Sequence, residues 1–75
     1  MKVRSYLVYP NQIDKSELAD LLNSYPCCEA VPSSNENMLI LITTTTDEKQ
    51  ENDLQEKFKS MPQLATMALV FAQEE

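Results

Sequence analysis

The chain has 75 residues and a formal net charge of −6, from 12 acidic and 6 basic side chains, and it contains neither histidine nor glycine. A domain of this size has little room for both a core and a catalytic cleft, and the missing residues exclude Ser-His or Cys-His pairs and glycine-rich phosphate loops, so we expect no enzyme activity. The surplus of acids disfavours nucleic acid as a partner and favours a basic one, the alternative being that the charge only keeps a small protein soluble.

A strand and a helix are predicted in the first third of the chain. Residues 3–9 are rich in β-branched and aromatic side chains and stop at the turn signal Pro10-Asn11. Asp14 can cap the helix that follows, and Glu17 stands at the reciprocal position of a capping box. An apolar stripe at helical spacing should face the core, and it consists of Leu18, Leu21, Leu22 and Tyr25.

Two further strands are predicted in the middle of the chain. Pro26 ends the helix, and residues 28–31 form a short strand that Pro32 confines to a sheet edge, because proline has no N–H to donate to a neighbouring strand. Residues 33–37 form a connecting turn. Residues 38–44 form a third strand whose first five residues are all apolar, which is typical of a central strand.

A second helix and a last strand complete the chain. Thr45 and Glu48 offer a capping box for a helix over residues 47–58. Its inward side is narrow and consists of Leu54, Phe58 and Met61. Pro62 stops this helix, and residues 64–72 form the last strand.

The predicted order, βαββαβ, indicates an α+β fold of the ferredoxin-like split βαβ type, as a single domain over residues 1–75. We expect a four-stranded antiparallel sheet with the first and third strands in the centre and both helices on one face. The other face of the sheet then has no helix over it. An exposed apolar patch with an acidic rim on this face would mark a protein-binding surface.

The apolar pattern of the strands suggests which residues lie on the face without helices. We assign to it Ser5, Leu7, Tyr9, Leu39, Leu41, Thr66, Ala68 and Val70. The core then takes Tyr6, Val8, Met67, Leu69 and Phe71. In the third strand the other alternate set is Met38, Ile40 and Ile42, and these residues form the binding side if the assignment of the two faces is inverted. The alternatives for the uncovered face are that it stacks on a second copy of the chain, or that the C-terminal tail partly shields it.

The two cysteines, Cys27 and Cys28, are adjacent, which disfavours both a disulfide between them and a complete tetrahedral metal site. Strand alternation should turn Cys28 inward and leave Cys27 nearer the surface. Spaced cysteine pairs and a signal-peptide pattern are both missing, and the longest apolar run, residues 38–42, is too short to span a bilayer. We therefore expect a cytoplasmic protein with no metal and no integral membrane segment.

Two segments of the sequence resemble a known family. They are Leu22-Asn23-Ser24-Tyr25-Pro26-Cys27-Cys28-Glu29-Ala30 and the closing stretch from Leu64 to Glu75. Together with the order and lengths of the elements, they resemble the NapD family of small cytoplasmic chaperones. That family usually shows a Pro-Gly-Cys-Glu pattern at the turn, and Cys27 stands where the glycine would be. If the family backbone needs a positive φ there, this chain must strain or reshape its turn.

The resemblance implies a function. NapD proteins bind the twin-arginine signal peptide of the periplasmic nitrate reductase catalytic subunit and hold back export until the enzyme has folded and received its molybdenum cofactor. The chain itself would carry no cofactor and would be a monomer or a weak homodimer. An acidic rim beside an apolar sheet face suits such a peptide. The signal-peptide-binding residues would be Ser5, Leu7, Tyr9, Glu29, Leu39, Leu41, Thr66, Ala68 and Val70.

The alternative function is a self-associating regulatory module of similar fold that binds a small ligand at a dimer interface. A partner peptide with paired arginines would favour the chaperone, as would a monomer at micromolar concentration.

Overall fold

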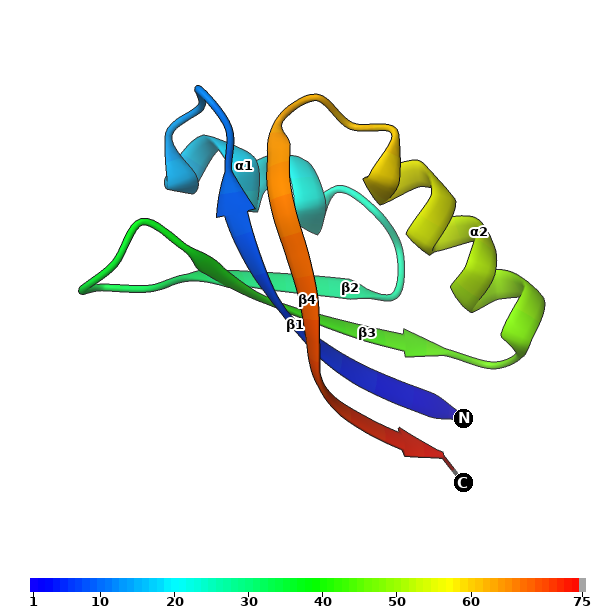
Figure 1. Cartoon of the computed structure of the whole chain (residues 1–75). Coiled ribbons are helices and arrows are strands. Elements are labelled where there is room, and N and C mark those ends of the chain that lie inside the picture. The colour runs from blue at the N-terminus through cyan, green and yellow to red at the C-terminus, as the bar shows by residue number, and fades with distance from the viewer. Residues whose placement is uncertain (75) are drawn as a thin grey trace.

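The computed structural model describes residues 1–74 and contains the six predicted elements in the predicted order (Figure 1). Their bounds are β1 (Lys2–Pro10), α1 (Lys15–Asn23), β2 (Cys28–Pro32), β3 (Leu39–Thr45), α2 (Glu48–Lys59) and β4 (Leu64–Glu74). Within the described residues, neither helix is long and apolar enough to cross a membrane.

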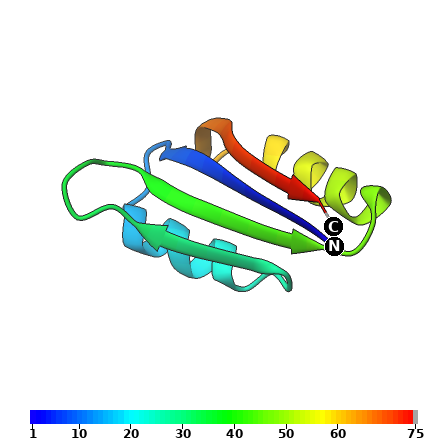
Figure 2. The same ribbon diagram turned by 90° about the horizontal axis from the view of Figure 1, so that it is seen from below.

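The four strands form one sheet in the order β2-β3-β1-β4, and each neighbouring pair is antiparallel. β1 and β3 therefore occupy the centre, as right-handed crossovers predict. Both helices lie on the same side of the sheet, which is seen in front of them in Figure 2. The ferredoxin-like α+β fold predicted from the sequence is confirmed.

Helix α1 begins as predicted and is fastened to β2 at its end. The carboxylate of Asp14 caps the helix by accepting a hydrogen bond of 3.0 Å from the backbone N–H of Ser16. At the other end, the Asn23 amide group donates to the carbonyl of Ala30 at 3.0 Å and accepts from its N–H at 2.8 Å. One side chain thus satisfies both backbone groups of a residue in an edge strand.

Helix α2 begins at a different cap from the one predicted. Asp47, rather than Thr45, is the N-cap residue, and its carboxylate accepts a hydrogen bond of 2.8 Å from the N–H of Gln50. The Gln50 side chain reaches back to the N–H of Thr46 at 2.9 Å. The Thr45 prediction is wrong because β3 continues through Thr45 and buries its side chain.

The core lies between the sheet and the two helices. It consists of Tyr6, Val8, Leu18, Ala19, Leu22, Ala30, Leu39, Leu41, Leu54 and Phe58. The assignment of Leu39 and Leu41 to the uncovered face is wrong, since both are fully buried, and Ile40 is exposed instead. The register of the strands explains this correction. Leu41 pairs with Tyr6, which is in the core, and directly paired residues share a face of the sheet.

β4 contains two residues that have no partner in β1, and after each of them the following residues of β4 point to the opposite side of the sheet from the one that simple alternation predicts. Ser5 pairs with Phe71 while Tyr6 pairs with Leu69, so Val70 is an extra residue opposite β1. Phe71 consequently shares a face with Ser5 and is 51% exposed, and its assignment to the core is wrong. Leu69 is on the helix side but is 53% exposed, because an edge strand has a neighbour on one side only. A second shift leaves Ala65 as the other extra residue.

Candidate functional site

The side of the sheet that faces away from the helices, called the open face below, carries an apolar row across all four strands. Ile40 of β3 pairs with Val31 of β2 on one side and with Leu7 of β1 on the other, and Leu7 pairs in turn with Ala68 of β4. The row is accessible, since the side chain of Val31 is 50% exposed and that of Ile40 is 41% exposed. A contiguous apolar row of this kind is typical of a surface that binds another protein segment.

A second row lies beside the first and ends in a charge. Glu29 pairs with Ile42, Ile42 with Ser5, and Ser5 with Phe71. The Glu29 side chain is exposed on the edge strand β2. A ligand lying across the open face would thus meet a carboxylate at one end of this row and an aromatic ring at the other.

A hollow of about 280 Å³ lies next to Glu29. It is lined by Cys27, Cys28, Glu29, Ile42 and Thr44. A carboxylate beside an apolar wall suits an arginine, whose guanidinium pairs with the carboxylate while its methylene stem packs on apolar groups. The hollow is therefore a candidate subsite for a basic side chain.

The turn before β2 places the two cysteines in different environments. Cys27 is exposed and has a φ of 69°, in the left-handed region where glycine is favoured. Cys28 packs against the core, as alternation predicted. Burial, followed by the charges of Cys27 and Glu51, raises the pKa of the Cys28 thiol to about 11. Both cysteines are free thiols, and no group of three potential metal ligands occurs among residues 1–74.

The structure brings most of the predicted binding residues together. Six of them lie on the open face, and these are Ser5, Leu7, Tyr9, Glu29, Thr66 and Ala68. Leu39 and Leu41 lie in the core, and Val70 is the exposed extra residue of β4. Ile40 and Ile42 also lie on the open face, as the inverted assignment of the third strand expects, and Val31 and Phe71 join them although they were not predicted there. The position of Val31 could have been predicted from the sequence. If Cys28 points into the core, alternation along β2 also turns Ala30 inward and places Val31 on the open face.

A buried carboxylate lies on the other side of the sheet, under α2. Glu51 is fully buried, and its Oε1 accepts hydrogen bonds from the hydroxyls of Thr43 at 3.1 Å and Thr45 at 3.2 Å. Its Oε2 accepts one from Tyr6 at 3.2 Å, and Arg4 Nε lies 4.0 Å from Oε1. These hydrogen bonds join α2 to the sheet. Because the Glu51 carboxylate is fully buried, it cannot contact a ligand on the open face.

Comparison of the chain with protein-family models, with curated protein sequences and with solved structures gives no significant match.

Proposed function

We propose that the chain is a chaperone that binds a twin-arginine signal peptide on the open face, as the resemblance to NapD proteins implies. The observation that carries the proposal is the exposed apolar row Val31, Ile40, Leu7 and Ala68, with the carboxylate of Glu29 one row away. A twin-arginine signal peptide combines two cations with an apolar segment. The open face offers a surface for each part.

The backbone at Cys27 supports the same proposal. The NapD pattern has glycine at this turn, and the chain keeps a φ of 69° there although the residue is cysteine. The turn therefore retains the backbone shape that glycine would allow, at a cost of about 1–2 kcal/mol for a residue with a Cβ. This shape positions Glu29 at the start of β2, beside the hollow.

The mechanism we propose is physical rather than chemical. The apolar segment of the peptide covers the apolar row, and one arginine pairs with Glu29, so that the export signal stays covered until the enzyme has folded and received its molybdenum cofactor. The net charge of −6 accelerates the encounter with a cationic peptide at low salt.

The decisive experiment is a calorimetric titration with the signal peptide of a periplasmic nitrate reductase catalytic subunit from the same source. A second peptide, with both arginines replaced by glutamine, should bind more weakly. Glu29→Gln should weaken binding of the native peptide but change the affinity for the arginine-free peptide little. Glu17→Gln removes the same charge from the exposed side of α1 and is the matched control.

Two results would contradict the proposal. The first is equal affinity for the two peptides, which would remove the role of the arginines. The second is no binding at all by a folded chain that forms dimers at micromolar concentration, which would favour a regulatory module with its ligand site at a dimer interface.

A further inference from the structure

The two edges of the sheet differ in how they can receive another strand. At the β2 edge, the Asn23 side chain occupies both backbone groups of Ala30, at 2.8 and 3.0 Å, and Pro32 has no N–H. Both features prevent a further strand from pairing there. The β2 edge is therefore protected.

The β4 edge has neither form of protection. β4 pairs with β1 on one side, and among residues 1–74 no strand pairs with it on the other. Residues 64–73 include no charged residue and no proline. In a chain of net charge −6, this neutral edge is where two copies can approach each other with the least repulsion.

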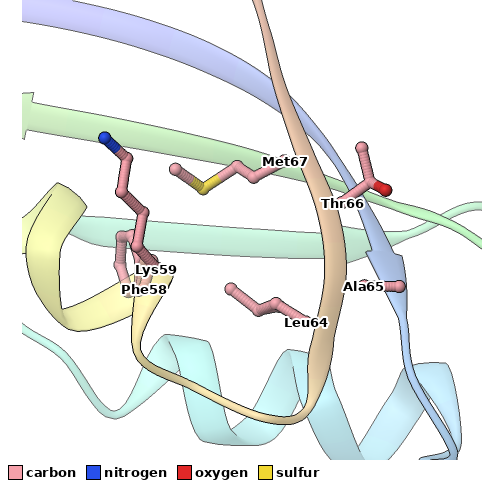
Figure 3. A pocket seen from close by; sticks show the side chains of 6 residues that line it. All are labelled: Phe58, Lys59, Leu64, Ala65, Thr66 and Met67. Atoms are coloured by element: carbon pink, nitrogen blue, oxygen red, sulfur yellow. The ribbon is translucent and has the colours of Figure 1, made fainter.

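The helix side of β4 carries both a protruding side chain and a hollow. Leu69 protrudes and is 53% exposed. Two residues earlier on the same side, Met67 borders a hollow of about 210 Å³ between β4 and the end of α2. Figure 3 shows Leu64 and Met67 pointing into this hollow toward Phe58. The protruding Leu69 and one wall of the hollow thus lie on the same strand, and the opposite wall is formed by Phe58 and by Lys59 of α2.

We propose that this edge binds a second copy of the chain, by antiparallel pairing of the two β4 strands about a two-fold axis at Ala68. In this register Leu69 of each copy lies opposite Met67 of the other, so each Leu69 packs beside the other copy's hollow. Ala68 faces its own copy across the axis on the open face, where two small side chains fit opposite each other without a clash. The two sheets become one continuous sheet of twice the width.

The pairing is short, and the association is accordingly weak. The extra residues Ala65 and Val70 interrupt the regular strand on either side, and Thr66 would lie opposite Val70, so the regular pairing is limited to residues 67–69. We therefore expect a chain that is monomeric at low micromolar concentration and dimeric toward the millimolar range. Both open faces point to the same side of the dimer and stay accessible, so the pairing of the β4 edges is independent of what binds to the open faces.

Sedimentation velocity between about 10 μM and 1 mM tests the association. Leu69→Lys should raise the dissociation constant about tenfold or more, because it places two charges against the hollows. Asn52→Lys makes a comparable change on an exposed position of α2 and should leave the constant within about twofold. A wild-type chain that stays monomeric at 1 mM, or two variants that dimerise alike, would overturn the proposal. Loss of dimers in Ile40→Lys but not in Leu69→Lys would place the interface on the open face instead.

A cross-link tests the register in a folded chain without adding charge. In a Cys27→Ser, Cys28→Ser background, Ala68→Cys should form a covalent dimer on mild oxidation, since directly opposed residues lie within disulfide distance. Asn52→Cys in the same background should remain a monomer. Equal cross-linking of the two variants, or none of Ala68→Cys at millimolar concentration, would contradict pairing at Ala68.

Discussion

The hydroxyl of Tyr6 in β1 donates a hydrogen bond of 3.2 Å to the buried carboxylate of Glu51 in α2, across 45 residues of sequence. The same carboxylate accepts from the hydroxyls of Thr43 and Thr45 in β3. α2 buries few apolar side chains, namely Leu54 and Phe58. This polar cluster is therefore a principal attachment of α2 to the two central strands.

The first prediction concerns the stability of this attachment. Glu51→Ala removes the acceptor for three buried hydroxyl groups and should lower the free energy of unfolding by about 2–4 kcal/mol. Glu56→Ala, at an exposed position of the same helix, should change it by less than about 0.5 kcal/mol. Urea unfolding followed by circular dichroism measures both. Equal stability of the two variants would show that the cluster does not hold α2.

The second prediction separates the two sides of β3. Ile40→Glu should leave the chain folded and lower its affinity for the signal peptide by about 1–3 kcal/mol, because Ile40 is 41% exposed in the middle of the apolar row. Leu41→Glu should prevent stable folding, because Leu41 is fully buried opposite Tyr6. Thermal unfolding and peptide titration measure the two effects. Full peptide affinity in Ile40→Glu would exclude the open face as the binding surface.

The order of the elements could be predicted from signals in the sequence. Which side chains of β3 and β4 point toward the helices could not. Helical spacing, proline positions and β-branched runs place all six elements, and the right-handed crossover places β1 and β3 in the centre. In β3, both alternate sets of residues are apolar, so periodicity cannot select a face. Only the pairing of Leu41 with Tyr6 does so, and this pairing is a long-range contact.

The start of α2 was also mispredicted, because two capping boxes fit the sequence there. Thr45-x-x-Glu48 and Asp47-x-x-Gln50 are both capping boxes, and burial of the Thr45 side chain decides between them. The buried position of Glu51 could not be predicted from a helix rich in acids, because it depends on hydroxyls contributed by another element. Of the ten open-face residues named for the candidate site, alternation in the sequence predicted six, and strand pairing in the structure adds Val31, Ile40, Ile42 and Phe71.

The third prediction uses the positive φ of Cys27. Cys27→Gly should leave the free energy of unfolding unchanged or raise it by up to about 1 kcal/mol, because glycine adopts this conformation without steric cost. Cys27→Val should lower it by more than about 1 kcal/mol, because a β-branched side chain is strongly disfavoured there. Urea midpoints of the two variants provide the test, and a valine variant as stable as the glycine variant would contradict the strained turn.

The fourth prediction concerns pH. The pKa of Cys28 rises from its usual value of 9.0 to about 11 in the folded chain, chiefly through burial. The unfolded chain therefore loses this proton first, and the contribution of Cys28 to stability should decrease as pH rises from about 9 to 11. Cys28→Ser should flatten this part of the stability profile, whereas Cys27→Ser should not. At pH 8, iodoacetamide should modify exposed Cys27 before Cys28, which peptide mass mapping can verify.

The two extra residues of β4 make this strand tolerant of changes in length. Its 11 residues span the 9 of β1 because Ala65 and Val70 are accommodated as offsets. If one residue between Thr66 and Leu69 were deleted, Val70 could enter the regular ladder in its place, and Phe71 and the residues after it would keep their partners. β3 alternates strictly and contains no extra residue. A deletion within it would therefore move every side chain after the deleted position to the opposite face of the sheet. Natural variation in length is therefore expected in the last strand and not in the third.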